Sequence, residues 1–144
     1  MTPVRAFGEG FPPKSVGIVG VSRKEETRAP GYSGLKLFRS LRTSGYGGSL
    51  YPINPKTREI DGVSTYPDVV SVPERLDLVV ITVPAAVVPG VLEDCVAAKV
   101  RNVQICTSGF GETGTEEGKL LDDKRREIIQ KGKLRVVGPN CRGV

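Results

Sequence analysis

Short apolar segments alternate along this chain with longer segments whose apolar residues recur at helical spacing. The short segments are typical of buried strands and comprise Val16 to Gly20, Ser49 to Ile53, Leu78 to Val83, Val103 to Cys106 and Leu134 to Val137. The third of them is apolar almost throughout, as a parallel strand covered on both faces needs to be. Pro52 favours a sheet edge or a strand end for the second, because proline cannot donate to a ladder.

Helices are predicted between these strands. They span Tyr32 to Gly45, about Ala86 to Lys99, and about Thr115 to Lys131. The apolar positions expected to face the sheet are Leu37, Phe38 and Leu41 in the first helix, Val88, Val91, Leu92, Cys95 and Val96 in the second, and Leu120, Leu121, Ile128 and Ile129 in the third. Pro89 has to lie in a first helical turn, and Gly45 and Gly132 are expected to stop the helices that they follow.

Regular alternation of strand and helix predicts an α/β fold, a doubly wound parallel sheet of Rossmann type with helices on both faces. A length of 144 residues favours one domain. We expect this domain to occupy residues 14–144, after a loose lead-in formed by residues 1–13. The last residues, Gly138 to Gly143, are rich in turn formers, so we expect a fragment of a longer protein; a naturally short chain is the alternative.

Composition excludes several kinds of chemistry. The chain has no histidine, which removes Ser-His-Asp and Cys-His catalysis and any histidine metal site within it. Cys95, Cys106 and Cys141 match no zinc spacing, and an odd number without an export signal argues against a disulfide framework. We therefore expect no metal site, a cytoplasmic location, and core packing for Cys95 and Cys106. No apolar run approaches the ~20 residues of a membrane span.

The net charge of +5 is unevenly distributed. Residues 1–72 hold ten basic and six acidic residues, whereas residues 73–144 hold eleven and ten. The positive excess lies where a first βαβ unit would bind phosphate, although chance and solubility offer an alternative explanation. Scattered basic residues and the absence of a stacking motif argue against nucleic-acid binding.

In doubly wound sheets, ligands bind beyond the carboxyl ends of the strands. The segments expected there are Gly20 to Gly34, Asn54-Pro55-Lys56, Val83-Pro84-Ala85 and Thr107 to Glu112. The first departs from a dinucleotide fingerprint, which has three glycines within six residues, because a long polar loop follows Gly20. That loop can still bring Ser22 and backbone N–H groups to a phosphate at the helix start; a mobile surface loop is the alternative.

The end of the second strand is more informative. An NAD site favours Asp or Glu there, to accept from the ribose hydroxyls. This chain has Asn54 and then Lys56, and a lysine attracts a phosphorylated ribose, so NADP and coenzyme A (CoA) both qualify. The alternative is that Asn-Pro-Lys is only a turn. In the last segment, Thr107 to Glu112, two glycines allow a close approach of backbone to ligand.

Five short motifs follow one another along the chain. They are VGIVGVS at Val16 to Ser22, GYGGSLYPINPK at Gly45 to Lys56, DLVVITVPA at Asp77 to Ala85, SGFGE at Ser108 to Glu112 and GPNCRG at Gly138 to Gly143. In this order and spacing, the chain from about Phe11 to Val144 resembles the N-terminal CoA-binding domain of the nucleoside-diphosphate-forming acyl-CoA synthetases. This family includes ADP-forming acetyl-CoA synthetase and is related to the succinyl-CoA synthetase alpha subunit.

The resemblance implies that CoA is the ligand. It implies that Gly20 to Ser22 lie against the CoA phosphates, Lys56 near the ADP portion, Val83 to Ala85 along the adenine or pantetheine path, and Ser108 to Glu112 toward the thiol. It also implies that Asn140 and Cys141 lie where acyl and phosphoryl groups meet. With the crevice segments, the expected cofactor-binding residues are Gly20, Val21, Ser22, Gly34, Asn54, Pro55, Lys56, Val83, Pro84, Ala85, Thr107, Ser108, Gly109, Phe110, Glu112 and Asn140.

The family converts acyl-CoA, NDP and phosphate to acid, CoA and NTP through a phosphohistidine in a later domain and an ATP-grasp domain. The resemblance therefore implies that this chain binds CoA, supplies no catalytic residue, and works with those downstream domains or subunits. One alternative is a non-catalytic CoA-binding or regulatory module, stand-alone or fused to a protein acetyltransferase. A fragment of an NADP-dependent oxidoreductase is another, which the glycine spacing disfavours.

Overall fold

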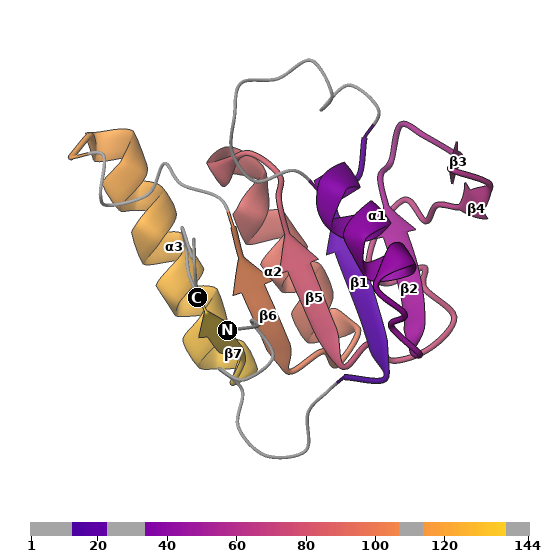
Figure 1. Cartoon of the computed structure of the whole chain (residues 1–144). Coiled ribbons are helices and arrows are strands. Elements are labelled where there is room, and N and C mark those ends of the chain that lie inside the picture. The colour runs from indigo at the N-terminus through magenta and orange to yellow at the C-terminus, as the bar shows by residue number, and fades with distance from the viewer. Residues whose placement is uncertain (1–12, 23–33, 107–113, 138–144) are drawn as a thin grey trace.

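The central sheet has five parallel strands in the order β2-β1-β5-β6-β7 (Figure 1). The strands are β1 (Ser15–Val19), β2 (Ser49–Ile53), β5 (Leu78–Ile81), β6 (Asn102–Ile105) and β7 (Arg135–Val137). The computed structural model describes residues 13–22, 34–106 and 114–137. Each of the five strands that the apolar segments predict is present, so the expected parallel α/β sheet is confirmed.

Strand burial follows the position of each strand in the sheet. β1 and β5 are neighbours at the centre, and every residue of both is buried. This explains why residues 16–19 and 78–81 form continuous apolar runs rather than alternating ones. β2 is an edge strand, and its first three residues are more exposed than its last two. Pro52 therefore lies in an edge strand, as predicted.

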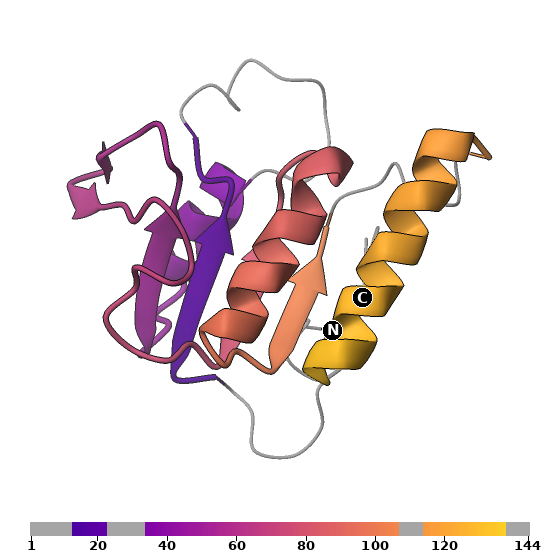
Figure 2. The ribbon, with the colours of Figure 1, turned by 180° about the vertical axis from the view of Figure 1, so that it is seen from behind.

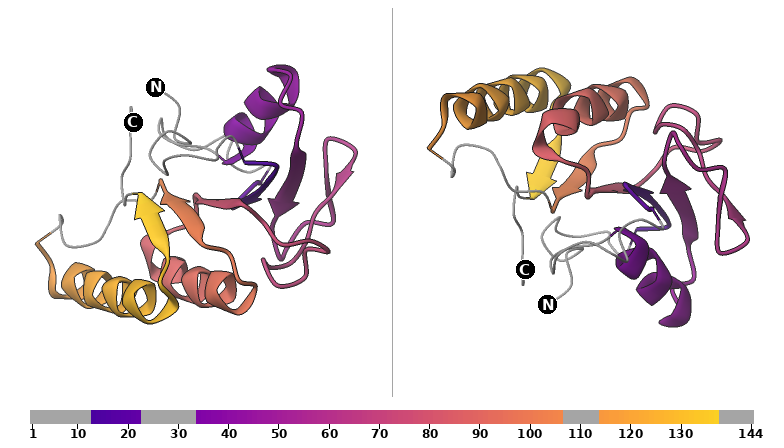
Figure 3. Two further views of the ribbon diagram at one scale, coloured as in Figure 1. Left: turned by 90° about the horizontal axis from the view of Figure 1, so that it is seen from below. Right: turned by 90° about the horizontal axis from the view of Figure 1, so that it is seen from above.

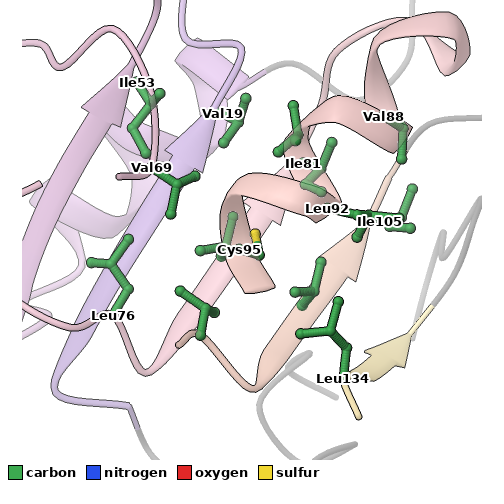
Figure 4. Packing of buried hydrophobic residues seen from close by; sticks show 14 of the residues in the cluster. Val19, Ile53, Val69, Leu76, Ile81, Val88, Leu92, Cys95, Ile105 and Leu134 are labelled. Atoms are coloured by element: carbon green, nitrogen blue, oxygen red, sulfur yellow. The ribbon is translucent and has the colours of Figure 1, made fainter. Parts of the chain in front are cut away.

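Helices cover both faces of the sheet (Figures 2 and 3). α1 (Gly34–Thr43) lies on one face, while α2 (Val88–Ala97) and α3 (Glu116–Gly132) lie on the other. Leu35 and Phe38 of α1 are buried in the core that faces this helix. The core on the opposite face is larger, and α2 contributes Leu92 and Cys95 to it (Figure 4). The doubly wound arrangement is confirmed.

The expected helix from Ala86 to Lys99 divides into two parts. A short 3-10 helix, η3 (Ala85–Val87), leads directly into α2. Pro89 is the second residue of α2, so its missing N–H falls in the first turn, where no intrahelical partner would be available, as predicted.

α3 differs from its prediction in two details. Leu120 was expected to face inward but is 69% exposed. Successive helix residues are rotated by about 100°, so Leu120 points away from the sheet-facing line that contains Leu121. Gly132 was expected to stop the helix, but it is the last helical residue, and Lys133 adopts the left-handed cap with a φ of 54°. A Cβ at Gly132 would overlap a methyl group of Val96, so this glycine serves the contact between α3 and α2.

A small antiparallel hairpin, formed by β3 (Glu59–Ile60) and β4 (Val63–Ser64), follows β2. The sequence predicts only its Asp61-Gly62 turn, which is confirmed by left-handed φ angles of 50° and 79°. Two-residue strands are too short to leave a periodic pattern. The Arg39 guanidinium of α1 lies 2.8 Å from the Asp61 carboxylate and fastens the hairpin to that helix.

Candidate functional site

A cleft of about 930 Å³ opens at the carboxyl ends of β1, β2 and β5, on the side of the sheet that α2 covers. In the strand order β2-β1-β5, the chain winds in opposite directions on either side of β1, and ligands of such sheets bind at this switch point. The described residues that line the cleft are Val19, Gly20, Ser22, Ile53, Asn54, Pro55, Lys56, Thr57, Pro67, Asp68, Val69, Thr82, Val83, Pro84, Val87, Gly90, Val91, Glu93 and Asp94.

The turn after β1 forms the floor of the cleft. Gly20 has a φ of +103°, a conformation that residues with side chains rarely adopt. Its N–H donates to the Ile53 carbonyl at 3.0 Å, which holds the turn against the end of β2. Ser22 follows at the cleft wall, half-buried, whereas Val21 is fully buried in the core. Gly20 and Ser22 therefore line the cleft, whereas Val21, one of the expected cofactor-binding residues, is buried behind it and anchors the turn.

α1 begins directly behind this turn. Gly34 is buried, and a Cβ there would lie 3.0 Å from the Gly20 carbonyl oxygen. Gly34 does not line the cleft; its lack of a side chain lets the helix start approach the turn. The positive end of the α1 dipole thus lies beside Gly20, where it favours an anion.

The segment after β2 carries a lysine to the cleft. The Asn54 amide Nδ2 donates to the Val21 carbonyl at 2.8 Å, and Asn54 Oδ1 accepts from the Lys56 backbone N–H at 2.8 Å. Asn54 therefore joins the turns after β1 and β2 and closes an Asx turn around Pro55. Lys56 is exposed at the cleft wall, where its ammonium group can contact a bound phosphate.

The segment after β5 supplies apolar surface. Val83 is half-buried and Pro84 is exposed, and both line the cleft. Ala85 begins η3 beside them and is not among the lining residues. The remaining expected residues, Thr107 to Phe110, Glu112 and Asn140, lie outside the described residues.

The wall formed by α2 and the loop after β4 is absent from the sequence-based prediction. α2 and η3 contribute Val87, Gly90, Val91, Glu93 and Asp94, and the loop contributes Pro67, Asp68 and Val69. The α2 positions lie three or four residues apart on one helical face, which is a visible signal. Nothing in the local pattern shows that the loop crosses to meet this face.

The α2 wall is acidic. Burial, followed by the nearby charges of Asp68 and Glu93, raises the pKa of the Asp94 carboxyl above its ordinary value. At the next residue, burial and then the Asp94 charge raise the pKa of the Cys95 thiol to about 12. Cys95 is fully buried and held as a thiol, so the expectation of a core cysteine is confirmed. Cys106 packs against the core on the α1 side.

Within residues 13–22, 34–106 and 114–137, no group of three or more His, Cys, Asp or Glu side chains is arranged to hold a metal ion. In the same part of the chain, no helix is both long and apolar enough to cross a membrane.

Comparison with known families decides between the phosphorylated ligands that suit this cleft. Residues 14–144 match the CoA binding domain family. The chain belongs to this family. As a CoA binding domain, it is homologous to the N-terminal part of ADP-forming acyl-CoA synthetases, and coenzyme A is its cofactor.

Its relatives include an ADP-forming acetate–CoA ligase of Methanocaldococcus jannaschii, which is 42% identical over 92% of this chain and 17% of the ligase. The alpha subunit of the ADP-forming acetate–CoA ligase I of Pyrococcus furiosus is 41% identical over 93% of this chain and 29% of the subunit. The apo form of the Ca. Korarchaeum cryptofilum dinucleotide forming acetyl-coenzyme A synthetase 1 superposes with a TM-score of 0.78, at 35% identity, over 89% of this chain and 26% of the synthetase. The CoA binding domain thus spans less than a third of these proteins.

The described residues of this CoA binding domain fit CoA chemically. Lys56 offers a cation to phosphates, and the turn at Gly20 allows a close approach of the backbone, while Val83 and Pro84 offer apolar contact to the uncharged parts of the cofactor. A volume of about 930 Å³ is within the usual range for small-molecule and cofactor sites. When bound, CoA supplies the thiol that carries an acyl group.

Proposed function

We propose that this CoA binding domain holds CoA or acyl-CoA in the cleft between the ends of β1, β2 and β5 and the flank of α2. Lys56 carries the argument, because it places a cation beside a turn and a helix start that already favour an anion. In this arrangement, Gly20, Ser22 and Lys56 contact the phosphates, and Val83 and Pro84 contact the adenine or the pantetheine.

We further propose that the whole protein is an NDP-forming acyl-CoA synthetase, which converts acyl-CoA, NDP and phosphate to acid, CoA and NTP. The names of the relatives, ADP-forming acetate–CoA ligases, support ADP and acetyl-CoA as the first nucleotide and thioester to test. Their greater length supports further catalytic domains or subunits as partners of this one. A cytoplasmic location agrees with the free Cys95 and Cys106.

Calorimetric titration of the 144-residue chain with CoA, acetyl-CoA and NADPH tests the cofactor assignment. We expect CoA to bind at least roughly tenfold more tightly than NADPH, a difference of ~1.4 kcal/mol. Both ligands carry a phosphorylated ribose, so the comparison separates recognition of CoA from attraction of any polyanion by a chain of net charge +5. Equal affinity for NADPH would refute the proposal.

A further inference from the structure

Thr82 lies where the end of β5 meets the turn after β1, and both of its donors are directed to one carbonyl. The Thr82 backbone N–H donates to the Val19 carbonyl oxygen at 2.9 Å, and the Thr82 hydroxyl donates to the same oxygen at 2.8 Å. The N–H on the other side of that peptide, from Gly20, donates to the Ile53 carbonyl at 3.0 Å. Because a peptide is planar, these bonds fix the orientation of the Val19–Gly20 peptide.

The same hydroxyl lies against the start of α1. A Cβ at Gly34 would lie 2.7 Å from Thr82 Oγ1, and a Cβ at Gly20 would overlap that oxygen. Both glycines therefore leave space that the Thr82 hydroxyl occupies. One oxygen atom thus lies where the turn after β1, the end of β5 and the start of α1 meet.

We infer that Thr82 is a positioning residue for phosphate binding, acting through the Gly20 turn and the start of α1 rather than by donating to the ligand. The inference rests on the proposed binding of CoA in this cleft. The Thr82 hydroxyl donates its hydrogen to the Val19 carbonyl. The groups that this bond orders are the backbone from Gly20 to Ser22 and the start of α1, and these are the groups proposed to contact the phosphates. Valine would fill the same space without the donor, and serine would keep the donor without the methyl group.

The test compares Thr82→Ser, Thr82→Val and Thr82→Ala with the parent chain by calorimetric titration with CoA. Ser15→Ala is the matched control. The Ser15 hydroxyl also bridges strand ends, donating to the Arg75 carbonyl at 3.1 Å and accepting from the Asp77 N–H at 3.0 Å, and Ser15 is 3% exposed. It lies at the opposite end of β1, so its loss should lower stability without reaching the cleft.

We expect Thr82→Ser to bind CoA within about twofold of the parent, and Thr82→Val and Thr82→Ala to bind roughly tenfold more weakly. The exchange rate of the Gly20 amide hydrogen should rise in Thr82→Val and Thr82→Ala and remain unchanged in Thr82→Ser and Ser15→Ala. Thermal unfolding of each variant gives its folded fraction at the titration temperature, so that a loss of affinity is assigned to folded protein.

Equal CoA affinity in the parent, Thr82→Ala and Thr82→Val would overturn the inference and leave the proposed function standing. An equal loss in Ser15→Ala would also overturn it, because the effect would then follow stability rather than the Gly20 turn. A parent chain that binds no CoA would refute the proposed function itself, and this inference with it.

Discussion

At the scale of single residues, Lys56 is the one basic side chain among the described residues that line the cleft. If it contacts a CoA phosphate, its ammonium makes a charge-assisted hydrogen bond of ~1.5–3 kcal/mol. We therefore expect Lys56→Ala to weaken CoA binding by roughly ten- to a hundredfold, and Lys56→Glu to weaken it further. Titration calorimetry at low and high salt measures the effect, which should shrink in high salt because exposed charges are screened over ~8 Å at physiological ionic strength.

Two comparisons sharpen the Lys56 experiment. Lys119→Glu changes the net charge equally at an exposed position of α3, outside the cleft, and should leave CoA affinity nearly unchanged. If the partner of Lys56 is the ribose 3′-phosphate, substitution of Lys56 should lower the affinity for dephospho-CoA less than the affinity for CoA. Unchanged CoA affinity in Lys56→Glu at low salt would remove Lys56 from the site.

Asp94 carries the opposite charge on the α2 wall. Its pKa is raised in the folded chain, so the folded state holds the proton more tightly than the unfolded state. Ionisation therefore costs folding free energy as the pH rises above the ordinary value of 3.8, and the cost persists at neutral pH. We expect Asp94→Asn to unfold at a higher temperature than the parent at pH 7, with the gain disappearing below about pH 3.8.

Asp94→Asn should also change the affinity for CoA. Removing a negative charge from a cleft that receives a polyanion should tighten CoA binding by about two- to threefold at low salt, as expected for charges ~10 Å apart in water. Asp123→Asn, at an exposed position of α3, provides the control for net charge. If the melting temperature of Asp94→Asn equals the parent value between pH 4 and 8, ionisation of Asp94 costs no folding free energy and the prediction is wrong.

At the scale of the helices and strands, the contact between α2 and α3 depends on Gly132. A Cβ at Gly132 would overlap Val96 Cγ2, and overpacking of this kind costs ~1–3 kcal/mol. Alanine is favoured over glycine within a helix by at most ~1 kcal/mol, which does not offset that cost. We expect Gly132→Ala to lower the free energy of unfolding by about 1 kcal/mol, measured by urea denaturation.

The effect of Gly132→Ala on the free energy of unfolding should change sign when the Val96 side chain is shortened. In a Val96→Ala background, the atom nearest to the added Cβ is the Cβ of position 96, 3.4 Å away, which is ordinary van der Waals contact. Gly132→Ala should then stabilise the chain by ~0.5–1 kcal/mol through helix propensity. Destabilisation of equal size in both backgrounds would show that Gly132 is needed for another reason. The pair therefore isolates the contact between the helices from the intrinsic preference of the last helical turn.

At the scale of the whole molecule, the sequence predicted the fold well because each strand of a parallel sheet carries its own local signal. β5 is apolar at every position and bounded by turn formers, so no long-range information was needed to find it. The face of α3 was harder to assign. Leu120 and Leu121 are equally apolar, and only the packing of α3 against α2 determines which of them turns inward.

The candidate site was predictable where it follows a strand directly. The ends of β1, β2 and β5 supply Gly20, Lys56 and Pro84, and parallel strands bring their carboxyl ends to one edge. Asp68 and Asp94 could not be predicted as cleft residues. They meet because the loop after β4 crosses to the flank of α2, and such a path depends on tertiary packing of Val69 and Val72 rather than on a local pattern.

The position of β1 between β2 and β5 has a consequence for folding during synthesis on the ribosome. Val19 of β1 and Thr82 after β5 are 63 residues apart along the chain, although they are bonded in the finished sheet. At a synthesis rate of 5–20 residues per second, β1 waits about 3 to 13 s for its partner to be translated. During that interval an apolar strand of the nascent chain lacks one of its two neighbours, so holdase chaperones should engage this protein before β5 emerges and release it afterwards.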